Sequence, residues 1–138
     1  MRKVMLRRLL SVMLLGLLLT AGCAGYRDLG EIEEAKQKAL NGERDYVFEL
    51  AEGLETTDEA NLRLAIIEAL DAVGDRGATM ALVRTMKSDP DTQVRVAVPP
   101  VLARMNARRA IEPLAEMVLD EDPQMRGAAL DRKSTRLN

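Results

Sequence analysis

A repeat of 32 residues constrains the fold of this chain more than any other feature. Two sets of residues keep this spacing: Leu50, Leu82 and Leu114, and Gly42, Gly74 and Asn106. The next turn of the pattern, at 122–126, matches 89–95 once two residues are removed after the proline. A period of this size is typical of supersecondary units that stack and bury one apolar face against the neighbouring unit. The repeat therefore predicts an array of stacked units.

Each period has the pattern of a helix, a short turn and a second helix. Asp28 with Glu31 and Thr56 with Glu59 have the spacing of capping boxes, and glycine is favoured where a helix ends. The predicted helices span about 29–40, 45–54, 56–73, 76–87, 88–105 and 108–119, and a seventh begins at 122–123. Apolar residues at a spacing of three and four predict a buried stripe along each second helix. These residues are Val47, Leu50, Ala51 and Leu54, then Leu82, Val83 and Met86, then Ile111, Leu114, Ala115 and Val118.

The composition argues against several kinds of chemical site. The chain has no histidine and a single cysteine, so it lacks the base of a nucleophilic triad and the ligands of a zinc site. The acidic residues at 120–122 and the pair Asp89 and Asp91 lack the glycine-containing, oxygen-rich loop of a calcium site. We interpret them as helix N-caps and solvated turns. The sequence therefore predicts no enzyme, no metal and no cofactor.

The first 23 residues have the organisation of an export signal. Four basic residues precede an apolar run at 9–19, and small residues follow it. The segment Thr20-Ala21-Gly22-Cys23 resembles the bacterial lipobox, in which a peptidase cuts before a cysteine that carries diacylglycerol. The resemblance implies cleavage after Gly22 and lipidation of Cys23, the only cysteine. The alternative is an uncleaved transmembrane helix, because 9–26 contains eighteen residues without a charge.

The resemblance also implies a location. Two or three acyl chains on Cys23 anchor a protein stably, whereas one anchors it marginally. Ala24 stands where many Gram-negative lipoproteins that stay at the inner membrane have an aspartate. We therefore expect a lipid-anchored protein of the cell envelope that faces the periplasm, at the outer rather than the inner membrane.

The charge of the mature chain bears on its partners. Residues 1–22 contain four of the twenty basic residues and none of the twenty-two acidic ones, so sixteen basic residues remain and the net charge is −6. An acidic chain is a poor binder of nucleic acid and of anionic lipid surfaces. The expected partners are the membrane, through the anchor on Cys23, and an unidentified protein.

Three segments carry a second resemblance. DPDTQVR at 89–95, GDRGA at 74–78 and AIEPL at 110–114 resemble HEAT repeats, in particular the short form also found in phycobilisome lyases. The resemblance covers 31–130 and implies an all-α, right-handed α-solenoid of helix pairs that serves as a scaffold. Arg63, Arg95 and Arg126 resemble the structural arginines of this family, which pair with acidic groups between layers. Tetratricopeptide repeats are the alternative solenoid, but their Trp, Leu-Gly and Tyr signature is missing.

The solvent side of the second helices is the expected binding surface, because it lines the inner curve of a HEAT stack. The 32-residue offset places two rows there: Phe48, Met80 and Glu112, and Glu52, Arg84 and Glu116. An exposed Phe and Met in one row could form an apolar contact patch for a partner. The alternative is that both side chains cover the neighbouring unit.

The predicted organisation has four parts. Residues 1–22 are the signal peptide, 23–28 the lipidated N-terminus and linker, and 29–130 the HEAT-like repeats. The last part, DRKSTRLN at 131–138, resembles a translated sequencing adapter, and we expect the repeats to be truncated there; the alternative is a genuine basic tail. The predicted function is a membrane-anchored scaffold for protein–protein interaction in the bacterial envelope. The alternative is the repeat region of a larger envelope enzyme or assembly factor whose C-terminal domain is missing.

Overall fold

The computed structural model describes residues 25–130, and every regular element within them is helical. The predicted signal peptide, Gly22, Cys23 and the segment 131–138 lie outside the described residues. The elements are α2 (Leu29–Leu40), α3 (Asp45–Thr56), α4 (Ala60–Val73), η1 (Arg76–Ala78), α5 (Thr79–Ser88), α6 (Thr92–Arg104), η2 (Arg108–Ala110), α7 (Ile111–Val118) and α8 (Pro123–Leu130). The prediction of an all-α solenoid of helix pairs is confirmed.

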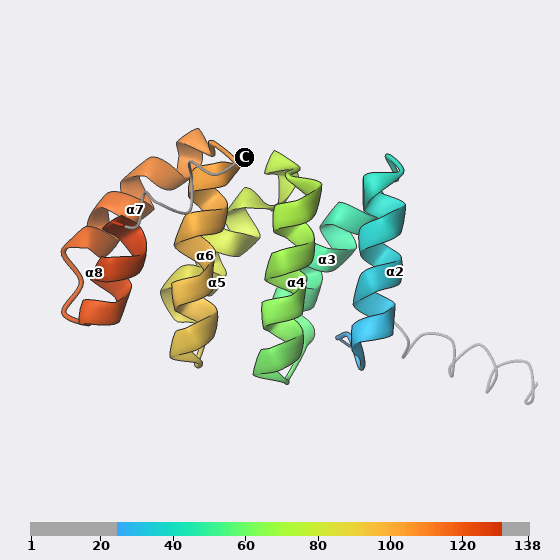
Figure 1. Cartoon of the computed structure of the whole chain (residues 1–138), viewed down its shortest axis with the longest axis horizontal. Helices are drawn as coiled ribbons and strands as arrows, with labels where there is room; N and C mark the ends of the chain where they lie inside the picture. Colours follow the sequence, from blue (N-terminus) through green and yellow to red (C-terminus); the bar gives the residue numbers. More distant parts are fainter. Residues whose placement is uncertain (1–24, 131–138) are drawn as a thin grey trace, which may run out of the picture.

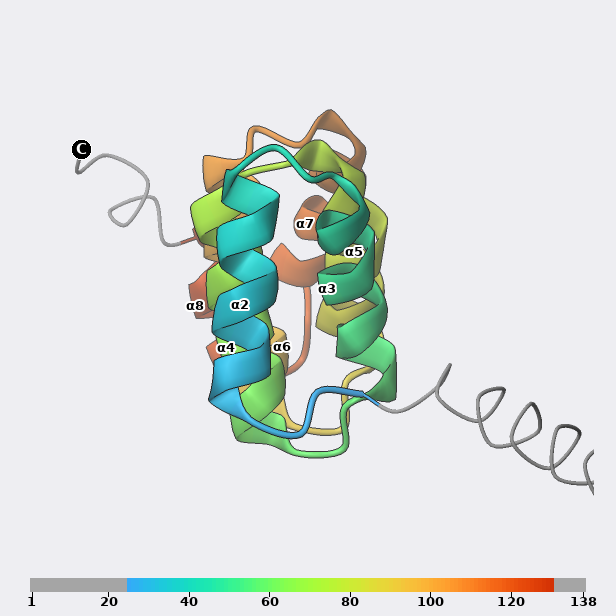
Figure 2. The same cartoon turned by 90° about the vertical axis from the view of Figure 1, so that its right-hand side faces the viewer.

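The helices form two layers. The first helices of the units, α2, α4, α6 and α8, stand side by side in one layer, and α3, α5 and α7 form the other (Figures 1 and 2). Each second helix packs against the first helix of the next unit, as α3 does with α4 and α5 with α6. No unit therefore completes its own core.

The turn inside each unit contains one residue in the left-handed region. Gly42, Gly74 and Asn106 have φ values of 96°, 67° and 49°, all in the left-handed region. Glycine adopts this region without strain, and asparagine is among the few other residues that tolerate it. These turns lie along one edge of the array, which we call the turn edge (Figure 1). The 32-residue offset of the three residues thus reflects a repeated helix ending.

The loops between units lie on the opposite edge, which we call the loop edge (Figures 1 and 2). In each loop an arginine from the following helix donates to two loop carbonyls. Arg63 Nη1 lies 2.9 Å from the carbonyl oxygen of Thr57 and 2.7 Å from that of Asp58. Arg95 and Arg126 bond the carbonyls at 89–90 and 120–121 in the same way. The three arginines therefore fix how the chain enters each new unit.

Arg63 also joins two loops. Its Nε and Nη2 atoms lie 2.8 and 3.0 Å from the two carboxylate oxygens of Asp89, and both side chains are buried. The predicted pairing of arginines with acidic groups is thus confirmed for Arg63. It is wrong for Arg95 and Arg126, since Arg95 donates to Thr92 Oγ1 instead and neither forms an ion pair within the described residues. The α3–α4 and α5–α6 loops are the two that a buried ion pair holds together.

The caps of α4 and α6 differ from the prediction. Thr56 does not cap α4, because it is the last residue of α3 and its hydroxyl donates to the carbonyl of Glu52. Helix α6 begins at Thr92, and its cap is Asp91, whose carboxylate accepts the N–H groups of 93 and 94. The interpretation of Asp89 and Asp91 as N-caps and solvated turns is confirmed for Asp91, whereas Asp89 is buried and accepts from Arg63 and from the N–H of Asp91.

The last unit follows an offset of 31 rather than 32. Asp122 caps α8 as Asp91 caps α6, and Asp120 accepts the N–H of Asp122 as Asp89 accepts that of Asp91. The alignment of Asp122-Pro123 with Asp89-Pro90 was therefore wrong.

Helix α7 is less buried than α3 and α5. Met117 is its buried residue, and Leu114 is half-buried against the core. Ile111 is 65% exposed and Ala115 is also exposed. The stripe predicted for this helix is therefore confirmed in part, at Leu114, and wrong at Ile111 and Ala115, whereas the stripes of α3 and α5 are confirmed.

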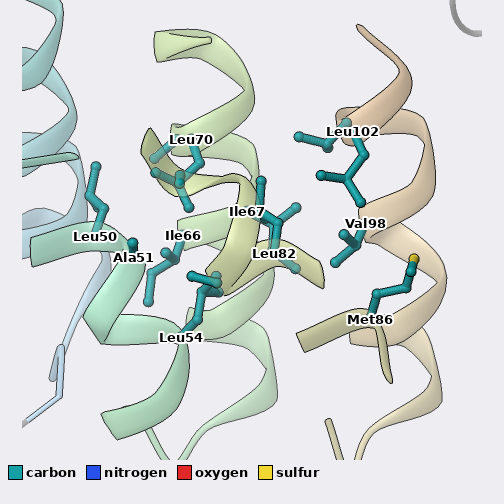
Figure 3. Packing of buried hydrophobic residues seen from close by; sticks show 14 of the residues in the cluster. Leu50, Ala51, Leu54, Ile66, Ile67, Leu70, Leu82, Met86, Val98 and Leu102 are labelled. Carbon is teal, nitrogen blue, oxygen red and sulfur yellow. The ribbon is translucent and has the colours of Figure 1, made fainter. Parts of the chain in front are cut away.

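The core runs without a break through the units. Figure 3 shows side chains from α3, α4, α5 and α6 meeting in one row between the layers. Leu50, Ile66 and Leu82 are each 0% exposed, and Leu102 is 1% exposed. A fully buried leucine or isoleucine contributes about 1.5–3 kcal/mol relative to an exposed one. Burial between neighbouring units therefore provides most of the favourable free energy of this fold.

We predict that Leu82→Ala destabilises the whole array. The truncation removes three carbons at a site shared by two units, and comparable changes cost about 2–5 kcal/mol. Urea unfolding followed by circular dichroism measures the loss. Leu119→Ala is the matched control, because Leu119 is 83% exposed and its truncation should change the free energy by less than about 0.5 kcal/mol. Equal effects of the two variants would contradict the continuous core.

A second prediction concerns the buried ion pair. Asp89→Asn leaves the Arg63 guanidinium buried without its counter-charge, which should cost about 3–5 kcal/mol. Asp120→Asn changes the equivalent carboxylate of the next loop, which is exposed and unpaired with any arginine in the described residues, so it should cost under about 1 kcal/mol. Thermal unfolding of both variants provides the comparison, and a small effect at Asp89 would show that the bridge is dispensable.

Candidate functional site

The predicted site has two parts, and the structure describes one of them. Cys23 and Gly22 lie outside the described residues, so the lipidation site stays a prediction. Between residues 25 and 130, no helix is both long enough and apolar enough to cross a membrane. The six residues predicted to bind a partner all lie on α3, α5 and α7.

The structure brings the two predicted rows to the solvent side of one layer. Phe48 on α3 is 55% exposed and Met80 on α5 is 45% exposed. Both helices pack side by side, which places the two apolar side chains on neighbouring helices of the same face. Glu112 extends this row on α7, and it is exposed. We call the row of Phe48 and Met80 the apolar patch.

Phe48 also contacts the next unit. A Cβ placed on Gly77 would lie 3.4 Å from Phe48 Cε1 and 3.6 Å from Cζ, so the ring rests beside η1. The ring therefore covers the neighbouring unit with one edge and presents the rest to solvent. Both alternatives raised by the sequence describe part of what this side chain does.

The second row is partly occupied by ion pairs between units. Arg84 Nε lies 2.6 Å from Glu55 Oε1, and Lys87 Nζ lies 2.7 Å from Glu116 Oε2. Both pairs are at least half exposed, and exposed pairs contribute about 0–1 kcal/mol. Arg84 and Glu116 thus connect neighbouring helices, while Glu52 has no ion pair among the described residues.

A third ion pair on this face involves the turn edge. Arg44 Nε lies 3.2 Å from Asp75 Oδ2. The N–H of Gly77 donates to Asp75 Oδ1 at 2.7 Å. This hydrogen bond is the main reason that the pKa of Asp75 is lowered, and the hydrogen bond and positive charge of Arg44 lower it further. A lowered carboxyl pKa contributes stability that is present above a pH of about 4 and is lost as the pH falls below it.

The residues that pair with Arg84 and Glu116 were missed by sequence reasoning. Each pair joins positions 29 apart, because the partner lies one turn after the equivalent repeat position on the preceding second helix. Opposite charges at a separation of one repeat minus one helical turn were the available sign. The same separation connects Arg84 to Glu55 and Glu116 to Lys87.

Two clefts open at equivalent positions of consecutive units. The larger, of about 500 Å³, surrounds the Arg63–Asp89 ion pair. The other, of about 350 Å³, lies over Met86, Arg95 and Met117. Among residues 25–130, no group of three His, Cys, Asp or Glu side chains is placed to hold a metal ion.

The comparisons with known proteins agree with this geometry. A family model for HEAT repeats matches residues 47–131, from α3 onward. No curated protein and no solved structure matches the chain. The match leaves out α2, the first helix of the array.

Proposed function

The chain belongs to the HEAT-repeat family, and we propose that it is a lipoprotein that holds a protein-binding solenoid at a bacterial membrane. The lipobox-like segment ending in Cys23 is the observation that carries the anchor. Acyl chains on Cys23 would tether the array at the periplasmic side, with the outer membrane as the expected location.

The apolar patch supports a binding rather than a catalytic role. Phe48 and Met80 expose about half of their surface on a face made of packed, rigid helices. Aromatic residues and methionine are enriched at protein interfaces, where a rigid apolar surface can be covered without a large loss of conformational entropy. A partner would cover the apolar patch and contact Glu52 and Glu112 at its sides.

The chemistry of the described residues also favours a scaffold. The polar groups around the larger cleft already bond one another, Arg63 with Asp89 and Arg84 with Glu55. Such groups stabilise the stack and leave few donors for a substrate. We therefore propose a non-catalytic protein whose role is to position a partner beside the membrane.

The anchor predicts a defined mass. Protein purified from the membrane fraction should begin at Cys23 and carry the mass of a diacylglycerol with or without a third acyl chain. Cys23→Ala should accumulate at the mass of the uncut precursor, because the peptidase cuts only before a lipidated cysteine. Intact-mass spectrometry measures both. A membrane-bound wild-type protein that still begins at Met1 and has no acyl mass would favour the uncleaved transmembrane helix.

The binding face predicts a separable effect of Phe48→Ser. A photo-crosslinking amino acid at Met80 should capture a defined envelope protein, and Phe48→Ser should abolish that product. The substitution should cost less than about 2 kcal/mol of stability, because Phe48 is already 55% exposed.

Leu119→Ser is the matched control, since it removes an exposed apolar side chain from another part of the array. It should leave the crosslink intact. Retention of the crosslink in Phe48→Ser, or its loss in both variants, would contradict binding at the apolar patch. A loss of stability well above 2 kcal/mol would instead assign Phe48 to the core.

A further inference from the structure

The chain is attached to the solenoid from Gly25 onward. A Cβ on Gly25 would overlap the Thr56 carbonyl and lie 2.5 Å from Thr57 Cα, so the backbone lies directly on the α3–α4 loop. The N–H of Tyr26 donates to Thr57 Oγ1 at 3.0 Å. Only glycine permits this close approach, because any other side chain would collide with backbone rather than with a movable side chain.

The ring of Tyr26 strengthens this attachment. A Cβ on Gly53 would lie 2.6 Å from Tyr26 Cε2 and 2.7 Å from Cδ2, so the ring packs directly against the backbone of α3 at Gly53. The hydroxyl is buried and has no hydrogen-bond partner within the described residues. Burial, followed by the negative charge of Glu49, raises the pKa of Tyr26. The ring is thus held by close packing on a glycine.

The next two residues lead directly into α2. The N–H of Arg27 donates to Glu31 Oε2 at 3.0 Å, and Asp28 Oδ1 accepts the N–H of Glu31 at 3.0 Å. We call residues 25–28 the strap. The strap is bonded along its length. Ala24 is the only residue between the strap and Cys23 in the sequence, so the tether from the anchor to the folded array is short.

The strap lies on the loop edge at the N-terminal corner of the array. Figures 1 and 2 both place the start of α2 beside the α3–α4 loop, while the end of α2 lies at the turn edge. Two residues of extended chain span at most about 7 Å, so Cys23 stays within that distance of Gly25. An anchor on Cys23 is therefore confined to this corner.

We propose that the corner formed by the strap and the α3–α4 loop is the surface that faces the lipid bilayer, and that the turn edge points away from it. This inference rests on the proposed lipid anchor. Helix α2 has 12 residues and is about 18 Å long, so Glu43 at the turn edge lies about that much farther from the bilayer than Asp58 in the α3–α4 loop. The apolar patch then faces sideways, open to a partner that stands on the same membrane.

Charge determines which bilayer is suitable for a test. The exposed carboxylates of Asp58 and Glu59 at this corner are repelled by anionic lipid, whereas Arg108 and Arg109 at the turn edge are attracted to it. A zwitterionic bilayer removes both effects and leaves the tether as the cause of orientation. The test therefore uses phosphatidylcholine vesicles.

Energy transfer to the bilayer surface measures the orientation. The acylated protein is reconstituted into phosphatidylcholine vesicles that contain a lipid with an acceptor dye on its headgroup. Asp58→Cys and Glu43→Cys each provide one free thiol for the donor dye, because Cys23 carries the lipid. Both positions are exposed, and neither side chain forms an ion pair in the described residues. The donor at 58 should be quenched more strongly than the donor at 43, by an amount that corresponds to a separation of about 18 Å.

A longer tether is the matched control. A flexible insertion of about 20 Gly and Ser residues between Ala24 and Gly25 leaves the strap and the fold unchanged and lets the array tumble over roughly 25 Å. The difference between the two donors should then disappear. Equal quenching without the insertion, or stronger quenching at 43, would overturn the proposed orientation.

The two proposals fail in different ways. Intact mass of the same sample reports whether Cys23 is acylated. A sample without acyl mass overturns the lipid anchor and the orientation together. An acylated sample with equal quenching at 43 and 58 overturns the orientation alone and leaves the proposed function standing.

Discussion

Burial of apolar surface between neighbouring units is the interaction on which the rest of this structure depends. Each second helix packs against the first helix of the following unit, so the core residues belong to two units at once. Leu50, Leu82 and Leu102 are almost completely buried only because the next helix is in place. Arg63 and Asp89 add a specific connection, since a buried ion pair contributes more to the choice of one geometry than to net stability. Short repeats of this kind fold as an array or do not fold.

The same packing produces the two surfaces for which we propose a role, the apolar patch that binds a partner and the corner that faces the bilayer. Because α3 and α5 are held side by side, Phe48 and Met80 share a face that does not need to be ordered when a partner binds. Arg63 fixes the α3–α4 loop, so the loop provides a rigid surface on which Gly25 and Tyr26 pack. A rigid stack thus provides both a place to bind a partner and a fixed exit point for a membrane tether.

The sequence predicted the fold well at positions where only one structural role explains the residue type. Gly42, Gly74 and Asn106 keep the 32-residue offset because each ends a helix in the left-handed conformation. The sequence was less informative where a side chain had several possible partners. Thr56 and Asp89 are residue types that commonly cap helices, but neither caps one here. Thr56 bonds the carbonyl of Glu52, Asp89 pairs with Arg63, and Asp91 caps α6. The change of offset from 32 to 31 before Asp120 was also hidden, since a one-residue change can be placed in a loop or in a helix with equal ease. The site was predicted by position, but the ion pairs of Arg84 and Glu116 require knowledge of how far one helix is shifted along the next.

Native-state hydrogen exchange tests the central claim most directly. If the units share one continuous core, the slowest amides of α3, α4 and α6, among them those of Leu50, Ile66 and Leu102, should open with the same free energy and with the same dependence on urea. That common value should equal the global free energy of unfolding. Amides of one unit that exchange through a separate, smaller opening while the others stay protected would show that the helix pairs fold independently, and would contradict the account.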